Sequence, residues 1–255
     1  MLYASLHPVL GVTLPFTRER VWGDKEKTSM PKKKTSCVAV LTADIIRSTR
    51  YTTVERRRVD RVLAKAFRDV IRLYPTALHT KLAFRVTAGD EFQCVFSDVP
   101  QSFHILTYLR AVCATSGLSP ALTFRASLGI GDISVSGKTS PYEEDGQAFV
   151  RSRRGLEQLE KEKRTRWTKI VTGNPEADSA IDVILLLLDQ TQKDWTVPQW
   201  EAVRWILMGQ TREQVAKKLS VAHQSVTKRL AAAGWHSFKI SSDYLTRRLN
   251  EACKP

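Results

Sequence analysis

The sequence predicts an α+β protein, in which a ferredoxin-like domain of order β-α-β-β-α-β is followed by an all-α helix-turn-helix domain. Two patterns carry this prediction. Between residues 37 and 133, apolar runs of strand length alternate with amphipathic stretches of helical period, in the order of a split βαβ fold. After residue 195 only helical patterns remain. We therefore expect an antiparallel sheet with both helices of the fold on one face, followed by a helical tail.

The first strand and the first helix have the clearest signals. Residues 38–44 are almost wholly apolar, which predicts a central strand covered on both faces. Thr52 and Glu55 form a capping-box pattern where the next helix begins. Apolar residues then recur at helical spacing until Pro75, which ends the helix.

A β-hairpin is predicted next, with strands over 82–87 and 91–96 joined at Ala88-Gly89-Asp90. Glycine at the turn accepts backbone angles that a Cβ would forbid. A helix over 100–116 and a strand over 122–133 complete the β-α-β-β-α-β order. A helix over 146–162 and a short strand over 167–171 follow.

Asn174 and Pro175 are typical of the N-cap and first turn of a further helix. Its apolar stripe around residues 181–188 needs covering, either by the sheet or by a second copy of the chain. We expect a homodimer.

The tail is predicted to form helices over 198–208, 212–219 and 222–233, with a final short helix over 244–252. The middle two resemble the helix-turn-helix of DNA-binding regulators, in which small Ala216 lets the helices approach and Val226 and Leu230 anchor the second. The residues left facing outward, as donors to base edges and phosphates, are His223, Gln224, Ser225, Thr227, Lys228 and Arg229. A helical bundle used only for dimerisation is the alternative.

The domain boundaries follow from these patterns and from the charge. Residues 1–35 are predicted to be a flexible basic arm, 36–173 the sheet domain, 174–195 a connecting helix and 196–255 the helix-turn-helix domain. The net charge is +14, and the last 60 residues hold ten Lys and Arg against four Asp and Glu. A basic excess of this size favours a polyanion such as nucleic acid or nucleotide as the partner.

The four cysteines form no CxxC pair, which disfavours a zinc site. Cys37 and Cys94 lie on predicted strands and are expected to be buried free thiols, as in a cytoplasmic protein. No apolar run reaches the length of a membrane span, and the N-terminal stretch lacks the basic start of a signal peptide. We expect a cytoplasmic protein that does not contact a membrane.

Acidic residues at two predicted strand ends suggest a metal site. Asp44 ends the first apolar run, and Asp90 and Glu91 lie at the tip of the hairpin. Carboxylates that meet in this way suit Mg²⁺ (or Mn²⁺), which takes a few protein oxygens together with phosphate oxygens and water. The alternative is that these carboxylates cap strand ends and pair with nearby arginines.

Four segments carry a resemblance to known families. Residues 42–49 (TADIIRST) resemble the DIxxST signature of class III nucleotidyl cyclases, and 88–92 (AGDEF) resemble both the GD of those cyclases and the GGDEF of diguanylate cyclases. Residues 125–131 (RASLGIG) and 145–154 are similar to the strand and the catalytic helix of the cyclase pattern. Together with the tail, the chain resembles the SatD family.

The resemblance implies roles for particular residues. Metal would be held by Asp44, Asp90 and Glu91 with the Ile45 carbonyl, and the catalytic arginine would be Arg153 or Arg154. A purine nucleotide would be bound through Ile46, Arg47, Ser48, Thr49, Arg50 and Gly89. Two departures are visible, because Val150 stands where a cyclase has its transition-state Asn and Ala88 replaces the first Gly of GGDEF.

Two functions are therefore carried forward. In the first, the sheet domain binds a nucleotide with metal and biases a DNA-binding tail. In the second, the sheet domain is an active nucleotidyl cyclase or nucleotidyltransferase. The altered half of the cyclase pattern and the basic tail favour the first.

Overall fold

The computed structural model describes residues 37–79, 84–86, 90–133, 146–162 and 166–254. All of them belong to one compact unit, Thr35–Pro255. The predicted N-terminal arm, residues 1–35, lies outside the described residues.

A five-stranded sheet forms the centre of this unit, in the order β2-β3-β1-β4-β5. Strand β1 is antiparallel to β3 and β4, β2 is antiparallel to β3, and β5 is parallel to β4. The predicted β-α-β-β-α-β order is present, and β5 extends the sheet beyond it. The strands are β1 (Val38–Ile45), β2 (Arg85–Val86), β3 (Glu91–Phe96), β4 (Phe124–Gly131) and β5 (Thr168–Val171).

The central position predicted for the first strand is confirmed, because every residue of β1 is buried. The predicted hairpin is described only in part. Strand β3 has the expected bounds, whereas Ala88 and Gly89 of the turn and much of the strand expected over 82–87 lie outside the described residues.

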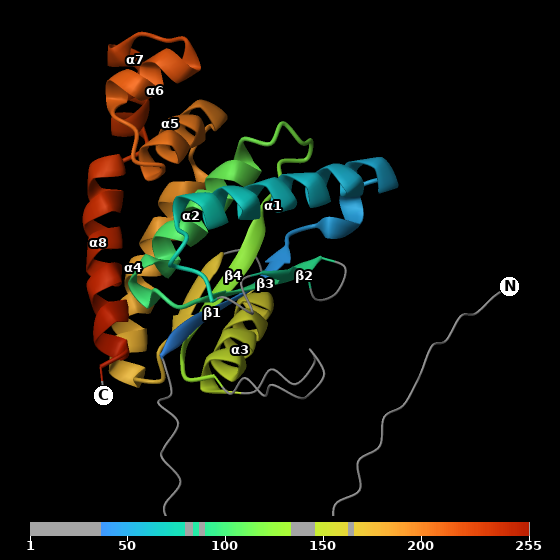
Figure 1. Cartoon of the computed structure of the whole chain (residues 1–255), viewed down its shortest axis with the longest axis vertical. Coiled ribbons are helices and arrows are strands. Elements are labelled where there is room, and N and C mark those ends of the chain that lie inside the picture. Colours follow the sequence, from blue (N-terminus) through green and yellow to red (C-terminus); the bar gives the residue numbers. More distant parts are fainter. Residues whose placement is uncertain (1–36, 80–83, 87–89, 134–145, 163–165, 255) are drawn as a thin grey trace, which may run out of the picture. The chain divides into compact units, whose positions relative to one another are not determined.

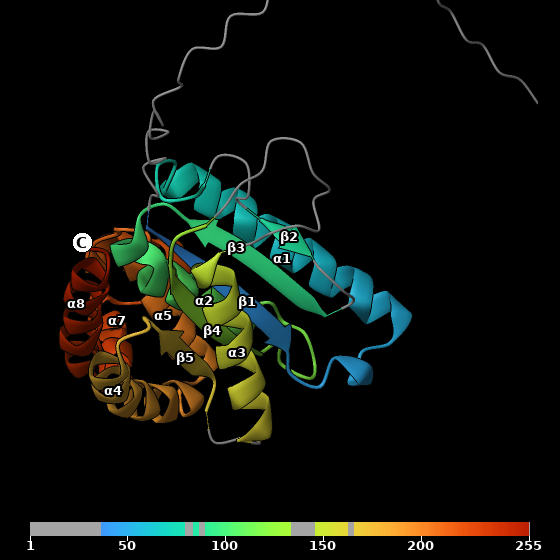
Figure 2. The same cartoon turned by 90° about the horizontal axis from the view of Figure 1, so that it is seen from below.

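Helices cover both faces of the sheet. Helices α1 (Thr53–Leu73) and α2 (Ser102–Ala114) pack on one face, and α3 (Gln147–Lys161) lies across the other (Figures 1 and 2). Two glycines let α3 approach closely: a Cβ on Gly129 of β4 would lie 2.1 Å from Ala148 O, and one on Gly155 of α3 would lie 2.1 Å from Ser127 Oγ. Single-turn helices η1 (Ser48–Arg50) and η2 (Val99–Gln101) precede α1 and α2.

The predicted helix starts are confirmed by their caps. The Thr52 side chain accepts a hydrogen bond from Glu55 N at 3.3 Å, and Glu55 Oε2 accepts one from Thr52 N at 2.8 Å, which is the reciprocal capping box. Asn174 Oδ1 accepts hydrogen bonds from Glu176 N and Ala177 N, both at 3.1 Å, at the start of α4 (Pro175–Lys193).

Helix α4 divides its apolar side chains between two environments. One side packs into the core, and the other remains exposed to solvent in the single chain. The buried members include Ile181, Leu185 and Leu188, and the exposed ones are Val183, Leu186 and Leu187. The sheet domain therefore covers part of the stripe, and self-association through the rest stays a prediction.

Four helices form the C-terminal part: α5 (Val197–Leu207), α6 (Arg212–Leu219), α7 (His223–Ala232) and α8 (Trp235–Ala252). The first three lie where they were predicted. The short final helix predicted over 244–252 is wrong in its start, because α8 begins at Trp235, directly after Gly234 turns the chain in a left-handed conformation (φ 63°). Phe238, Leu245 and Leu249 supply the buried stripe that sustains the longer helix.

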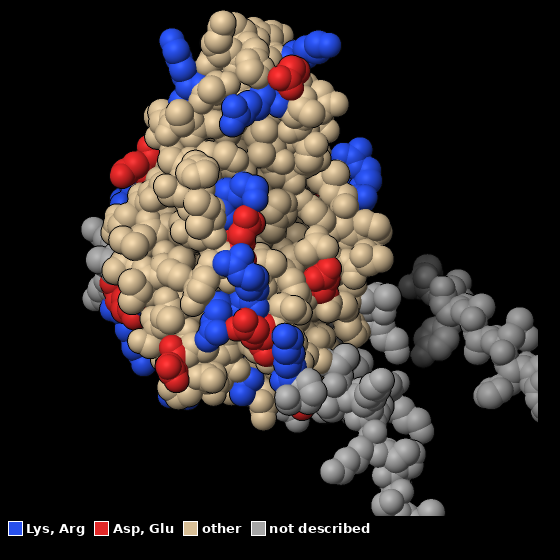
Figure 3. Space-filling view, turned by 90° about the vertical axis from the view of Figure 1, so that its left-hand side faces the viewer, with Lys and Arg blue, Asp and Glu red and all other residues tan. Residues whose placement is uncertain are grey.

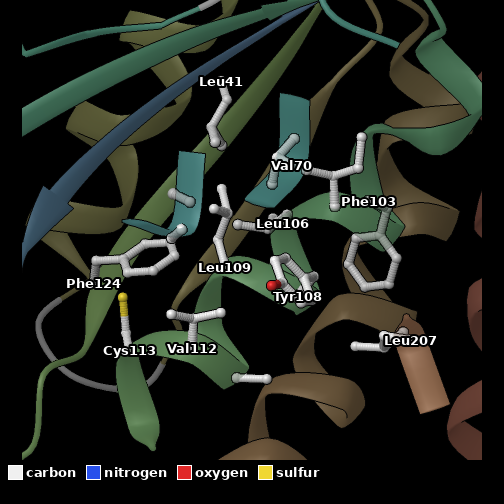
Figure 4. Packing of buried hydrophobic residues seen from close by; sticks show 14 of the residues in the cluster. Leu41, Val70, Phe103, Leu106, Tyr108, Leu109, Val112, Cys113, Phe124 and Leu207 are labelled. Carbon is white, nitrogen blue, oxygen red and sulfur yellow. The ribbon is translucent and has the colours of Figure 1, made fainter. Parts of the chain in front are cut away.

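The hydrophobic core runs without a break from the sheet into these C-terminal helices. Figure 4 shows α2 at its centre: Leu106 and Leu109 point toward Leu41 and Phe124 of the sheet, while Phe103 and Tyr108 face Leu207 of α5. Almost every residue of α2 is buried, because it is covered by the sheet on one side and by the tail on the other.

The cysteines correct one prediction. Cys37 is not a free thiol but forms a disulfide with Cys253, 216 residues away. The pairing has no local sequence signal, because only the path of α8 brings the two ends together. Cys94 is a buried free thiol, as predicted. Since disulfides persist mainly in oxidising compartments, the cytoplasmic location loses one of its supports and stays a prediction.

None of the helices in the described part of the chain is both long enough and apolar enough to cross a bilayer.

Candidate functional site

Three charged side chains meet where β1 ends, on the face of the sheet that α3 covers. Asp44 is directly opposite Glu91 of β3 and Arg125 of β4 in the strand register. Directly opposite residues share a face of the sheet. Thr42, two residues before Asp44, is on this same face and bonds Ser152 of α3 at 2.8 Å. The predicted carboxylates Asp44 and Glu91 are therefore brought together beneath α3.

Asp44 is buried, with 8% of its surface exposed, and is paired with one cation. Arg125 Nη2 lies 2.6 Å from Asp44 Oδ2. Burial raises the pKa of Asp44, and the negative charge of Asp90 raises it further, although the hydrogen bond and charge of Arg125 lower it. The net direction is upward, so Arg125 does not fully offset the cost of an ionised Asp44. An additional cation at this carboxylate would be favourable.

Asp90 precedes β3 and is tied to the connection between β1 and α1. Ile45 N donates to Asp90 O at 3.2 Å, and Ser48 Oγ donates to Asp90 Oδ2. The other carboxylate oxygens, Asp44 Oδ1 and Asp90 Oδ1, accept no hydrogen bond from the residues that the structure describes.

The connection over residues 46–50 contains most of the residues predicted to bind nucleotide, and the backbone N–H groups of residues 46–49 were the expected phosphate donors. Ile46 N already donates to Thr123 O at 2.9 Å, so this group is not available. Arg47 has a left-handed backbone (φ 60°), which is uncommon outside glycine. Of the other side chains predicted to bind nucleotide, Ser48 is half-buried, and Arg47, Thr49 and Arg50 are exposed. Gly89 lies outside the described residues.

The two candidate catalytic arginines lie in different surroundings. Arg153 Nη1 donates to both carboxylate oxygens of Glu91, at 3.0 and 2.9 Å. Arg154 instead lines an open cavity of about 710 Å³ on the other side of α3, together with Arg151 and Lys169. Of the two, Arg153 is therefore the one beside the carboxylates. Val150, where the cyclase pattern has Asn, is 64% exposed on α3.

The predicted side-chain metal ligands Asp44, Asp90 and Glu91 come from two segments of the chain. Among the described residues, no three His, Cys, Asp or Glu side chains are arranged to hold a metal ion. Any metal at Asp44 and Asp90 would need further oxygens from a bound molecule or from water.

Helices α6 and α7 place the predicted DNA-contacting residues on a largely open surface. Ala216, Val226 and Leu230 are buried between the helices, as expected. Two of the predicted contacts are engaged within the chain: Arg229 Nη1 lies 3.5 Å from Glu201 Oε2, and His223 Nε2 lies 3.2 Å from Glu213 Oε1. Of the six predicted residues, His223, Gln224 and Lys228 are exposed, and Ser225, Thr227 and Arg229 are half-buried.

The side of the molecule along α8 carries charges of both signs. Figure 3 shows positive and negative side chains interspersed down this face. Ion pairs along α8 account for part of the pattern, with Lys239 Nζ 2.7 Å from Asp243 Oδ2 and Arg248 bound to Glu251. On this face, positive and negative side chains are therefore mixed and not gathered into a patch of one sign.

Sequence reasoning missed the part that Arg125 plays at this site. Its segment was noted only as a resemblance to a cyclase strand. The pairing with Asp44 depends on the register of β1 against β4, which no local pattern reveals.

The fold and this site define a mixed α/β protein with a charged cluster at one end of its sheet and a helical C-terminal part. The chain belongs to the SatD family, whose sequence model matches residues 38–247. Among solved structures, the chain is similar to the structure of a bacterial light-regulated adenylyl cyclase, with 15% sequence identity and a TM-score of 0.38. The similarity covers 64% of this chain and 83% of that chain. None of the curated proteins matches the sequence significantly.

Proposed function

We propose that the chain binds a purine nucleoside triphosphate together with Mg²⁺ (or Mn²⁺) at Asp44 and Asp90, and that this binding biases a DNA-binding helix α7. In this proposal, β1–β4 with α1 and α2 form a ferredoxin-like palm. The observation that carries it is the pair of carboxylates: they come from two separate segments, lie at one end of the sheet, and each keep one oxygen without a hydrogen bond from the described residues.

The donor set fits a metal ion that arrives with phosphate. Mg²⁺ is commonly bound by one or two carboxylates together with phosphate oxygens and water, so a site of three or more acidic residues is not required. Asp44 and Asp90, with the Ile45 carbonyl, would hold the ion, while Glu91 is engaged by Arg153. When bound, the metal would neutralise phosphate charge.

The arginines around the site could bind the phosphates of the proposed nucleotide. Arg47 and Arg50 are exposed at the connection from β1 to α1, and Arg153 and Arg125 lie on the side of α3. Guanidinium groups bind phosphate through charge-assisted hydrogen bonds. The competing interpretation is that the pairs Asp44–Arg125 and Glu91–Arg153 only stabilise the fold.

The two interpretations differ in how the melting temperature responds to ligand. We expect Mg²⁺ plus ATP or GTP to raise it in the wild type, and either component alone to do less. At a hundredfold excess over Kd, binding to the folded state alone stabilises it by about 2.7 kcal/mol. Asp44→Asn and Asp90→Asn should each abolish the added rise. Without ligand, both variants should be as stable as the wild type or more so, because Asp44 is buried next to a second negative charge.

The opposite pattern would defeat the proposal: variants that lose stability without ligand, and a wild type that does not respond to Mg²⁺ and nucleotide. Glu160→Gln is a control at the same cluster, because Glu160 lies 3.9 Å from Arg125 and its charge acts on Asp44, but it is not one of the proposed metal ligands. Mass analysis of the same incubations separates binding from the alternative function, since a cyclase or nucleotidyltransferase would convert the triphosphate.

The proposal for α7 rests on the arrangement of the two helices. Val226 and Leu230 fix α7 against α6, which leaves Gln224 and Lys228 exposed on its outer side. A helix held in this way and carrying donors on its open side suits a major groove.

A further inference from the structure

A partly enclosed cavity lies between the sheet and the C-terminal helices, on the face of the sheet opposite to the one that carries Asp44. Its volume is about 160 Å³, similar to engineered protein cavities that hold a benzene-sized molecule. Four aromatic rings form much of its wall, from Phe124, Trp167, Trp195 and Trp200, and Val197 at its rim is 53% exposed. Figure 4 shows two lining residues, Phe124 and Cys113, side by side against α2. The cavity is suited to a planar apolar molecule.

Two residues that line the cavity each carry a buried hydrogen-bond donor without a partner in the described part of the chain. Arg110 is 5% exposed and Gln192 is 1% exposed, and both line the cavity. Neither Arg110 Nε nor Gln192 Nε2 has a hydrogen-bond partner among the described residues. A buried donor left without a partner costs about 1–3 kcal/mol, and native proteins rarely keep two of them together. Both are donors, so the missing group is an acceptor.

The charge of Arg110 is already balanced within the protein. Its Nη1 donates to Thr168 Oγ1 at 2.7 Å and lies 3.5 Å from Asp189 Oδ1, and its Nη2 donates to Trp167 O at 2.8 Å. Asp189 is 1% exposed and also accepts hydrogen bonds from the backbone N–H groups of Trp167 and Thr168. The other cation of the lining, Lys193, is only half-buried and lies over the Trp167 ring, 5.4 Å from its centroid. An anion at the two buried donors would therefore be desolvated next to Asp189, at a guanidinium whose charge is already balanced. A neutral acceptor is favoured.

We propose that this cavity binds a small, planar, neutral molecule that presents a carbonyl oxygen or an aromatic ring nitrogen to Arg110 Nε and Gln192 Nε2. The aromatic walls select a flat ring, and the two donors orient it through its acceptor. This site shares no residue with the nucleotide site proposed above, although Thr123 O of its lining accepts a hydrogen bond from Ile46 N at 2.9 Å.

A matched pair of probes tests the proposal on the full chain: acetophenone, and α-methylstyrene, in which a CH₂ group replaces the carbonyl oxygen. We expect acetophenone to shift the indole N–H resonances of the cavity residues Trp167, Trp195 and Trp200, and to leave those of Trp205 and Trp235 in place. Loss of the hydrogen bonds should make α-methylstyrene at least about tenfold weaker, a factor that corresponds to about 1.4 kcal/mol. Benzoate, of similar shape but charged, should bind more weakly than acetophenone.

Two variants complete the design. Gln192→Met keeps the size of the side chain and removes one donor, so it should bring the affinities of the two probes closer together. Ala114→Leu fills the cavity from α2 and should weaken both. Equal affinity of the wild type for the two probes would mean that water satisfies the donors, and would overturn the proposal. Absence of acetophenone binding, or shifts confined to Trp205 and Trp235, would also overturn it.

Discussion

One half-buried histidine joins three helices through a single carbonyl oxygen. His104 Nε2 of α2 lies 3.1 Å from Leu207 O at the end of α5, and Tyr74 Oη, just after α1, donates to the same oxygen at 2.8 Å. Burial lowers the pKa of His104 and raises that of Tyr74 to about 12. Both side chains are therefore neutral at physiological pH, and His104 Nε2 also lies 3.0 Å from Tyr74 Oη.

The lowered pKa of His104 predicts how stability depends on pH. In the unfolded chain His104 takes up a proton near its ordinary pKa of 6.5, and in the folded chain only at lower pH. The unfolded state thus binds more protons in between, so this contribution to the free energy of unfolding is complete above that value and is lost as the pH falls below it. His104→Gln keeps a donor for Leu207 O without a titration.

The measurement is the free energy of unfolding by denaturant, at a series of pH values from about 7 to about 5. The free energy of unfolding of His104→Gln should decrease less steeply with falling pH than that of the wild type. His236, which is exposed on α8, offers a control for the same change of residue type, His236→Gln. Parallel curves for wild type and His104→Gln would contradict the prediction.

Single residues also show where the sequence was informative. Thr52 and Asn174 were recognised as caps because a cap and its partners lie within three residues of each other. The pairs Asp44–Arg125 and Cys37–Cys253 are separated by 81 and 216 residues, so they depend on the finished fold. The site residues Asp44, Asp90 and Glu91 were proposed from their places at strand ends, whereas the cation that meets Asp44 was not.

At the scale of elements, α7 is the helix whose proposed role is most open to direct test. Lys228 is exposed and makes no ion pair with the described residues, whereas Arg229 is 3.5 Å from Glu201. If α7 enters a major groove, Lys228→Ala should weaken DNA binding and lower the slope of log affinity against log salt by about one. Gln224→Ala should instead reduce discrimination between DNA sequences, because it would contact a base edge.

Fluorescence anisotropy at several salt concentrations measures both effects. Lys239→Ala removes one positive charge from α8, where Lys239 is paired with Asp243, and should leave the salt slope unchanged. If Lys228→Ala and Lys239→Ala reduced affinity equally, binding would reflect net charge alone, and the assignment to α7 would be wrong.

Helices and strands were predicted correctly where the apolar pattern was long. The prediction failed where a helix continued through residues that carry few apolar positions. The stripe of α1 and the apolar run of β1 were read directly from periodicity. The start of α8 was placed nine residues late, because only Phe238 marks its buried side before Leu245. The strand over 167–171 was predicted, but its parallel pairing with β4 requires the crossover by α3.

At the scale of the whole molecule, the C-terminal helices complete the core of the sheet domain. Phe238 of α8 is 2% exposed and its ring lies 6.4 Å from that of Phe103 of α2 and 5.1 Å from that of Trp195. Trp195 Nε1 in turn donates to Ala233 O after α7 at 2.7 Å. The proposed nucleotide site at the end of the sheet and the proposed DNA-binding helix α7 would thus belong to one packed unit.

This continuity predicts that the sheet domain and the tail unfold together. Phe238→Ala removes a fully buried ring at the contact between α8 and α2, and should lower the free energy of unfolding by about 3–5 kcal/mol. Ile240→Ala, two residues along the same helix at a side chain that is 56% exposed, should change it by less than about 1 kcal/mol. The decisive measurement is hydrogen exchange of the β1 amides, which lie at the centre of the sheet. With a shared core, Phe238→Ala speeds the exchange of β1 by the same factor as that of α8, because both amide sets exchange through one opening of the whole unit. If α8 exchanged faster while β1 kept its wild-type protection, the tail would be a separate cooperative unit, and ligand binding at the sheet could reach α7 only through a flexible link.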